Sequence, residues 1–167
     1  MRLVKCSTDM RPKPRVRWFL PSLILLSCIS CGQFNQNAPR KLSSNARLEV
    51  YETSLTNVPN TLAATDPVKG IKIYLLLPPI ITAADVDTVQ RSDDAAGISS
   101  LTVQMTPAGS TKLSAATSSA QPKQIAIVVN GAVINVVTPR STISQGFMLT
   151  GGALQKDREK IFDALTK

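Results

Sequence analysis

The chain has 167 residues, and its composition suffices for one modest core: 43% of the residues are hydrophobic, 18% charged and 4% aromatic. The net charge of +8 points at first to nucleic acid. However, residues 1–30 hold six basic side chains and one acidic side chain, which leaves 13 basic and 10 acidic residues in the remainder. Because those later basic residues are scattered, without aromatic residues between them, we expect no nucleic-acid binding.

The residues that most often perform catalysis or bind metals are missing from the body of the chain. There is no histidine, and Cys6, Cys28 and Cys31 all lie in the first 31 residues. No serine lies in a G-x-S-x-G or S-x-x-K pattern, and there is no phosphate-binding glycine loop. Neighbouring carboxylates such as Asp85 and Asp87 are typical of capping and solvation. We therefore expect no enzyme, no catalytic residue, no metal, no cofactor and no small-molecule substrate.

Residues 1–30 have the pattern of a secretory signal peptide. Basic residues between 11 and 17 precede an apolar run over 18–26. This run is shorter than the ~20 residues that a helix needs to cross a bilayer. Counted from Met1 the basic region is long, whereas a start at Met10 gives a more usual length, so Met10 is a candidate for the true start.

The segment LLSCISCGQ, residues 25–33, resembles the lipobox of bacterial lipoproteins. Cys28 has the usual Leu three positions before it, whereas Cys31 is followed by Gly-Gln, a common start of a mature lipoprotein. The motif favours Cys28 as the lipidated residue, and Cys31 is the alternative. An ordinary signal peptide is the alternative, but no A-x-A-type cleavage site follows the apolar run. We expect lipidation, attachment to the membrane on the periplasmic side and, since no Asp follows Cys31, the outer membrane.

The remaining chain divides into a polar tether over 31–46 and a domain over 47–167. Hydrophobic periodicity and capping residues predict the elements of this domain in chain order. They are a strand over 47–53, a turn-rich segment over 54–70, a strand over 71–77, a short helix after Thr82 with Val86 and Val89 facing inward, a strand over 98–106, a helix that Thr106 and Pro107 begin, a hairpin over 123–137, a strand over 146–149 and a helix over 153–166.

The hairpin is the clearest local signal. Two apolar strands flank Asn130 and Gly131, and Asn-Gly fits a two-residue type I′ turn because both positions need a positive φ. Strands predominate and helices are few. The pattern predicts a single α+β domain with a largely antiparallel sheet, a central β-hairpin and two or three helices packed on one face.

Over residues 47–166 the body resembles the head subdomain in the first large periplasmic domain of SecD and SecDF, accessory proteins of bacterial protein translocation. The matching segments come in the family's order and are RLEVYET, IYLLLPPIITAADV, LTVQMTPAGSTKL, KQIAIVVNGAVINVVTP and LTG. The aligned positions include Pro79, Thr82, Asp85, Thr106, Gly109, Lys112, Gly131 and Pro139. Asn130 stands where the family usually has Asp, and Gly146 alone remains of the glycines that precede the family's ITG.

The resemblance implies a protein or peptide partner, because this head region is thought to contact an emerging polypeptide. We expect no proton-driven pulling, since the family's six transmembrane helices have no counterpart here. The first hypothesis is a non-enzymatic envelope lipoprotein that binds protein or peptide and assists export or folding. A strand edge near 142–149 could pair with an extended chain. The alternative is a structural or docking subunit of a larger envelope complex.

Overall fold

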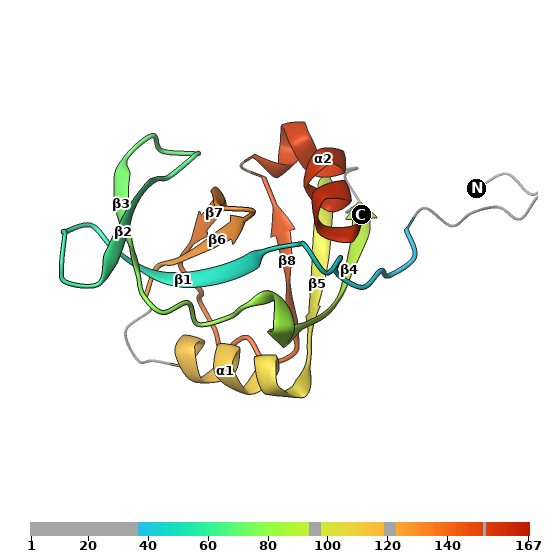
Figure 1. Cartoon of the computed structure of the whole chain (residues 1–167), viewed down its shortest axis with the longest axis horizontal. Helices are drawn as coiled ribbons and strands as arrows, with labels where there is room; N and C mark the ends of the chain where they lie inside the picture. The colour runs from blue at the N-terminus through green and yellow to red at the C-terminus, as the bar shows by residue number, and fades with distance from the viewer. Residues whose placement is uncertain (1–36, 94–97, 119–122, 152) are drawn as a thin grey trace, which may run out of the picture. The chain divides into compact units, whose positions relative to one another are not determined.

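Five strands form the larger of two sheets, and all neighbouring strands in it are antiparallel (Figure 1). The order across this sheet is β2-β3-β1-β6-β7. Its strands are β1 (Leu48–Ser54), β2 (Thr61–Thr65), β3 (Lys72–Leu76), β6 (Ile125–Val129) and β7 (Ala132–Val137). The computed structural model describes residues 37–93, 98–118, 123–151 and 153–167. Met10, Cys28, Cys31 and the predicted signal peptide lie outside the described residues.

The smaller sheet has three antiparallel strands in the order β4-β5-β8. They are β4 (Val86–Asp93), β5 (Ser99–Met105) and β8 (Gly146–Thr150). The central strand β5 buries Leu101, Val103 and Met105 on one face, as the alternation in its sequence predicts.

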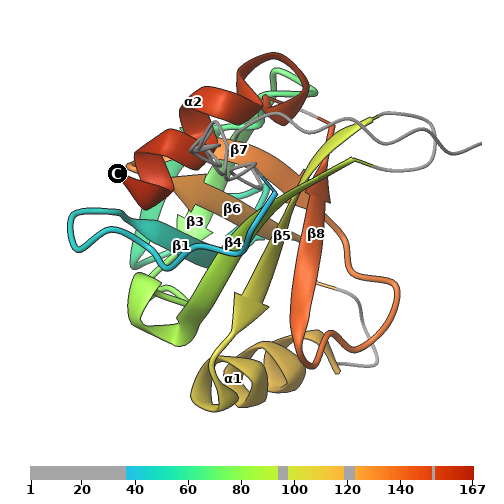
Figure 2. The ribbon, with the colours of Figure 1, turned by 90° about the vertical axis from the view of Figure 1, so that its right-hand side faces the viewer.

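Two helices complete the domain, together with a short 3₁₀ helix η1 (Ala83–Asp85). Helix α1 (Pro107–Thr117) begins as predicted: Pro107 occupies its first turn, and the Thr106 side chain accepts a hydrogen bond from the Gly109 N–H at 3.1 Å. Helix α2 (Leu154–Thr166) buries Leu154, Ile161, Phe162 and Leu165. In Figure 2, α2 lies near the top of the domain and α1 at the bottom.

The larger sheet buries apolar side chains on both faces. The main core includes Leu48 and Ile127 of this sheet together with Val103, Leu113 and Phe162. A second cluster on the other face is made of Tyr51, Ile73, Leu75, Ala126 and Val128. All five residues of β6 are therefore buried, which explains why IAIVV has no alternation in its sequence.

The predicted fold class, a single α+β domain with antiparallel strands, is confirmed, but the hairpin is not central. Strand β7 is the outermost strand of its sheet. Asn130 and Gly131 lie between β6 and β7 with φ of 48° and 83°. The Asn130 side-chain oxygen accepts a hydrogen bond from the Arg47 N–H at 3.0 Å, and the Asn130 N–H donates to the Arg47 carbonyl at 2.9 Å. The turn is thereby bound to the start of β1.

Three local expectations are wrong. The short helix predicted after Thr82 has Thr82 at its N-cap as expected, but it is only one 3₁₀ turn. Val86 and Val89 are buried as predicted, yet they belong to β4, since Val86, Thr88 and Val89 favour a strand that can pair with β5. Strand β2 lies inside the segment predicted as turns, where pairing with β3 stabilises the weak pattern TLAAT. Arg40 to Ala46, part of the predicted tether, contact the domain: Arg40 pairs with Val89, and Ala46 is buried.

Candidate functional site

Five positions that carry the SecD resemblance meet at one point, which we call the Asp85 junction: Thr82, Asp85, Thr106, Gly109 and Lys112. The Asp85 carboxylate accepts hydrogen bonds from the Thr82 N–H at 3.0 Å and the Thr82 hydroxyl at 3.1 Å. Its other oxygen lies 2.7 Å from the Lys112 ammonium. These contacts connect the turn before β4 to helix α1.

The backbone of Asp85 makes the second half of the junction. Its carbonyl accepts hydrogen bonds from the Thr106 N–H at 2.9 Å and from the Thr106 hydroxyl at 3.2 Å. A Cβ on Gly109 would lie 2.2 Å from the same carbonyl oxygen. Glycine is therefore required here by close approach between α1 and η1, and not by an unusual φ.

The charge at the junction is satisfied internally. Burial of the Asp85 carboxyl disfavours its ionised form and is the largest single influence on its pKa. The hydrogen bonds from Lys112 and Thr82, with the Lys112 charge, together outweigh burial and hold the pKa of Asp85 below its ordinary 3.8. A buried, paired carboxylate of this kind holds no proton to give near neutral pH. The contacts of the Asp85 junction thus hold α1 against η1.

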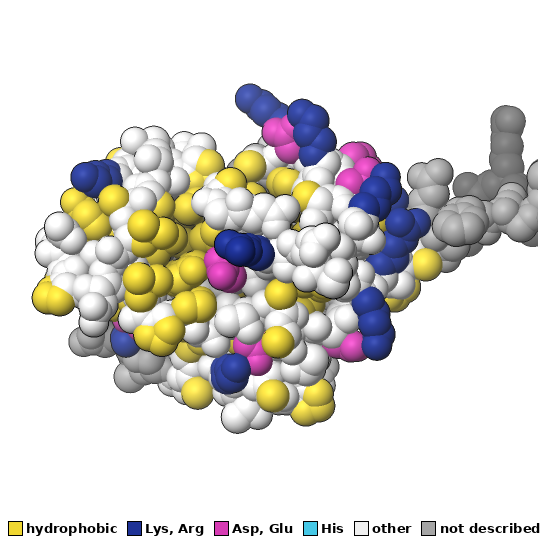
Figure 3. Space-filling view, in the orientation of Figure 1, with side chains coloured by type: hydrophobic (Ala, Val, Ile, Leu, Met, Phe, Trp, Pro, Cys, Tyr) yellow, Lys and Arg dark blue, Asp and Glu magenta, His cyan; other side chains and the backbone are white. Residues whose placement is uncertain are grey.

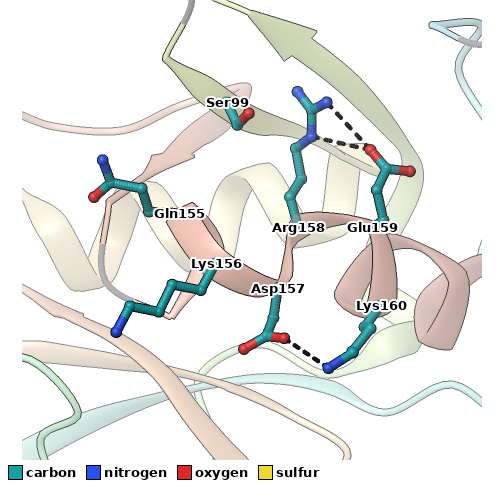
Figure 4. Close-up of a pocket in the computed structure, with 7 residues that line it drawn as sticks. All are labelled: Ser99, Gln155, Lys156, Asp157, Arg158, Glu159 and Lys160. Carbon is teal, nitrogen blue, oxygen red and sulfur yellow. Dashed lines mark hydrogen bonds and ion pairs between the residues drawn. The ribbon is translucent and has the colours of Figure 1, made fainter.

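A shallow depression of about 270 Å³ lies along the first half of α2 (Figure 4). Ser99 and the residues from 155 to 160 line it. Four of its charged groups form pairs within it: Lys160 lies 3.0 Å from Asp157, and Arg158 lies 3.2 Å from Glu159. No nucleophile lies beside a base among the residues drawn, so this depression is the solvated face of a helix.

The candidate binding site is an apolar pocket of about 240 Å³ between the two sheets, which we call the β7–β8 groove. It is lined by Ile125, Ile127, Asn135, Val137, Ile143, Phe147, Met148, Leu149 and Thr150. None of these side chains is charged. Met148, which also lines the groove, is 57% exposed.

Strands β7 and β8 each end their sheet, so each has one edge without a neighbouring strand among the described residues. The Met105 N–H donates to the Gln145 carbonyl at 3.0 Å, and bonded pairs alternate along antiparallel strands. The backbone groups of Gly146, Met148 and Thr150 consequently face away from β5. In agreement, the Thr150 carbonyl accepts a hydrogen bond from the Asn135 amide of β7 at 3.2 Å.

The sequence indicated an edge at 142–149 but not the groove beside it. Ile125, Ile127, Asn135 and Val137 belong to the predicted hairpin, and nothing in their spacing shows that they face β8. Only the folding of the two sheets against each other places them there.

Within the described ranges, no cluster of three or more potential ligand side chains could hold a metal ion. Neither helix in that part of the chain is long and apolar enough to span a membrane.

Comparison with known proteins gives structural likeness without sequence likeness: no family model and no curated protein match the sequence. Two solved structures of SecDF resemble the domain. One is described as a membrane component that enhances protein export, with a TM-score of 0.50 and 20% identity over 71% of this chain and 62% of that chain. The other is SecDF in a super-membrane-facing form, with a TM-score of 0.53 and 19% identity over 72% of this chain and 18% of that chain. The chain thus spans less than two thirds of either, and its domain has a fold found in SecDF.

Proposed function

We propose that the chain is a non-enzymatic envelope lipoprotein that binds extended segments of other proteins in the β7–β8 groove and so assists protein export or folding. The observation that supports this most directly is an edge of β8 that has no neighbouring strand among the described residues and lies beside an uncharged apolar pocket. The fold adds support, since it is shared with SecDF, which is described as enhancing protein export.

The geometry suits β-augmentation, in which a partner adds a strand to an open edge. The backbone groups of Met148 would pair with the partner's backbone, which gives affinity without regard to sequence. Alternate side chains of an extended segment point to opposite faces. One set would enter the groove between Ile127 and Phe147, and the other would face solvent. The groove therefore selects extended segments with an apolar residue at every second position.

The lipid anchor would hold this domain at the periplasmic face of a membrane. Because no Asp follows Cys31, we propose the outer membrane. We expect palmitate to label the full chain in cells through one cysteine. Replacing Cys28 with Ala abolishes labelling if the favoured register is used, whereas Cys31→Ala abolishes it in the other register. Cys6→Ala, in the predicted basic region, is the matched control and keeps the label. A wild-type chain without label would refute the anchor.

Peptide binding is tested by removing one backbone donor. Met148→Pro deletes an N–H that faces away from β5, so the β5–β8 pairing survives while an added strand loses a bond and meets the proline ring. We expect binding of a fluorescent octapeptide of alternating Leu and Thr to weaken about tenfold, because one lost bond and a steric clash cost ~1.4 kcal/mol or more.

Met148→Ala is the control for that measurement, since it shortens the side chain and keeps the N–H. Anisotropy with the full chain in mild detergent gives the affinities, and circular dichroism checks that both variants fold. Equal affinities of the proline and alanine variants would contradict strand addition at β8.

A further inference from the structure

A second surface, unrelated to the groove, gathers most of the exposed apolar side chains of the domain. We call it the β2–β3 wing, residues 54–77. Six of the eight large hydrophobic side chains that are exposed in the described part of the chain belong to it: Leu55, Val58, Leu62, Val68, Ile71 and Leu77. In Figure 3 hydrophobic side chains gather on the side of the wing, whereas charged side chains gather on the opposite side. Such a patch marks an interaction surface.

Within the described part of the chain, no strand lies beside the outer edge of β2. β2 ends the larger sheet, and its other edge pairs with β3. The Asp66 N–H donates to the Ile71 carbonyl, and the Leu77 N–H to the Asn60 carbonyl, both at 2.9 Å. Since bonded pairs alternate in an antiparallel ladder, Leu62 and Ala64 direct their backbone groups to β3. The groups of Thr61, Ala63 and Thr65 then point outward.

Strand β2 carries none of the side chains that usually prevent strands from pairing between molecules. Proteins protect open edges with lysine, proline, bulges or inward charges. No charged residue lies between Thr53 and Thr65, and the nearest prolines, Pro59 and Pro67, lie outside the strand. Leu62 is 56% exposed on the face that carries the buried residues Ile73 and Leu75.

We propose that β2 pairs with β2 of a second copy of this chain, antiparallel across a two-fold axis at Ala63. Ala63 then lies opposite the second copy's Ala63, and Thr61 opposite the second copy's Thr65, so that all outward groups find partners. The absence of charged residues favours a copy of the same strand. A two-fold axis brings the two copies of each residue close together, and with no charged residue between Thr53 and Thr65 this causes no repulsion between like charges. Each Leu62 lies opposite the second copy's Ala64, so large and small side chains alternate.

The two interfaces are compatible, because β2 and β7 are opposite ends of one sheet. Dimerisation extends this sheet and leaves the β7–β8 groove open. It goes beyond the proposed peptide binding and does not depend on it. A contact built on five-residue strands is small, and it predicts a dimer that dissociates on dilution.

Cysteine crosslinking in cells tests the register. Directly opposite residues of a bonded pair have Cα atoms ~5.5 Å apart, within the range that a disulfide spans. In the full chain, with its native cysteines retained, Ala63→Cys is expected to give an oxidised dimer on non-reducing gels beyond that of wild type. Thr65→Cys is the matched control: it lies on the same exposed edge, but its equivalent would be ~14 Å away along the strand. Equal crosslinking at both positions, or at neither, would overturn the proposal.

Sedimentation of the purified full chain in mild detergent tests the same contact without cysteine. Ala63→Lys places two ammonium groups opposite each other, and we expect the dimer to weaken by about tenfold or more. Met148→Lys, at an exposed position of β8, is expected to leave the dimer intact while it adds a charge to the groove. A wild-type chain that stays monomeric at all concentrations, or a dimer unaffected by Ala63→Lys with native circular dichroism, would refute the two-fold contact. If the wild-type chain dimerises but binds no peptide, the proposed function is refuted and the two-fold contact is not.

Discussion

Replacing Gly109 with Ala is expected to destabilise the domain by ~3 kcal/mol, although Ala is the better helix former by ~1 kcal/mol. The added Cβ would lie 2.2 Å from the Asp85 carbonyl oxygen and 2.9 Å from the Asp85 Cβ. Neither atom is the end of a flexible side chain. The first turn of α1 must therefore move away from η1, and the Thr106 hydrogen bonds to the same carbonyl would be lost.

Urea unfolding monitored by circular dichroism measures this change, with the full chain in both cases. The matched control is Ser110→Ala, one residue further along the same helix turn, which is expected to shift the free energy of unfolding by less than ~0.5 kcal/mol. If Gly109→Ala is as stable as wild type, the close approach of α1 to η1 is wrong.

Signals that act within a few residues were predicted well from the sequence. Thr106 and Pro107 begin α1 because a cap oxygen and a residue without an N–H satisfy the first turn locally. Asn130 and Gly131 need only their own φ values to make a turn. The alternation Leu101, Val103, Met105 likewise predicted the buried face of β5.

Features that depend on distant partners were not predictable in the same way. β4 follows a capping signal at Thr82, and only the available edge of β5 decides that Val86 and Val89 extend into a strand instead of a helix. β2 has a weak pattern of its own and exists through its pairing with β3. Arg40 lies in a polar segment, yet its guanidinium lies 5.5 Å from the Phe162 ring centre. None of these contacts produces a recognisable pattern among residues that are close in the sequence.

In the candidate site, too, only some of the features could be predicted from the sequence. A strand edge near 142–149 was predicted, and β8 does end its sheet among the described residues. The groove was not predicted, because β6, β7 and the segment before β8 contribute to it only after the sheets fold together. Five of the positions that carry the resemblance to SecD meet at the Asp85 junction, where their contacts join α1 to η1. A fold can therefore be recognised from such residues, although they do not reveal the candidate binding surface.

Replacing Asp85 with Asn is expected to cost ~2 kcal/mol at pH 7, since the charge-assisted bonds to Lys112 and Thr82 weaken and a neutral amide is left buried. The side chain of Asp85 is 6% exposed, whereas that of Lys112 is 53% exposed, so the freed ammonium regains water and limits the cost. The control is Asp87→Asn, an exposed carboxylate two residues away, for which we expect less than ~0.5 kcal/mol.

The pH dependence of the difference in free energy of unfolding between wild type and Asp85→Asn distinguishes the contribution of the Asp85 charge from that of the shape of its side chain. Because the pKa of Asp85 is lower in the folded chain than its ordinary 3.8, ionised Asp85 adds stability above pH 3.8, and this contribution is lost as the pH falls through the folded-state pKa. The amide of the Asp85→Asn variant has no such proton to bind. The gap in free energy of unfolding between wild type and Asp85→Asn, measured by urea titration from pH 7 down to about pH 2.5, should therefore narrow below about pH 4. A gap that stays constant over this range would mean that Asp85 acts through its shape and neutral hydrogen bonds, and that the Lys112 pair contributes nothing to the junction.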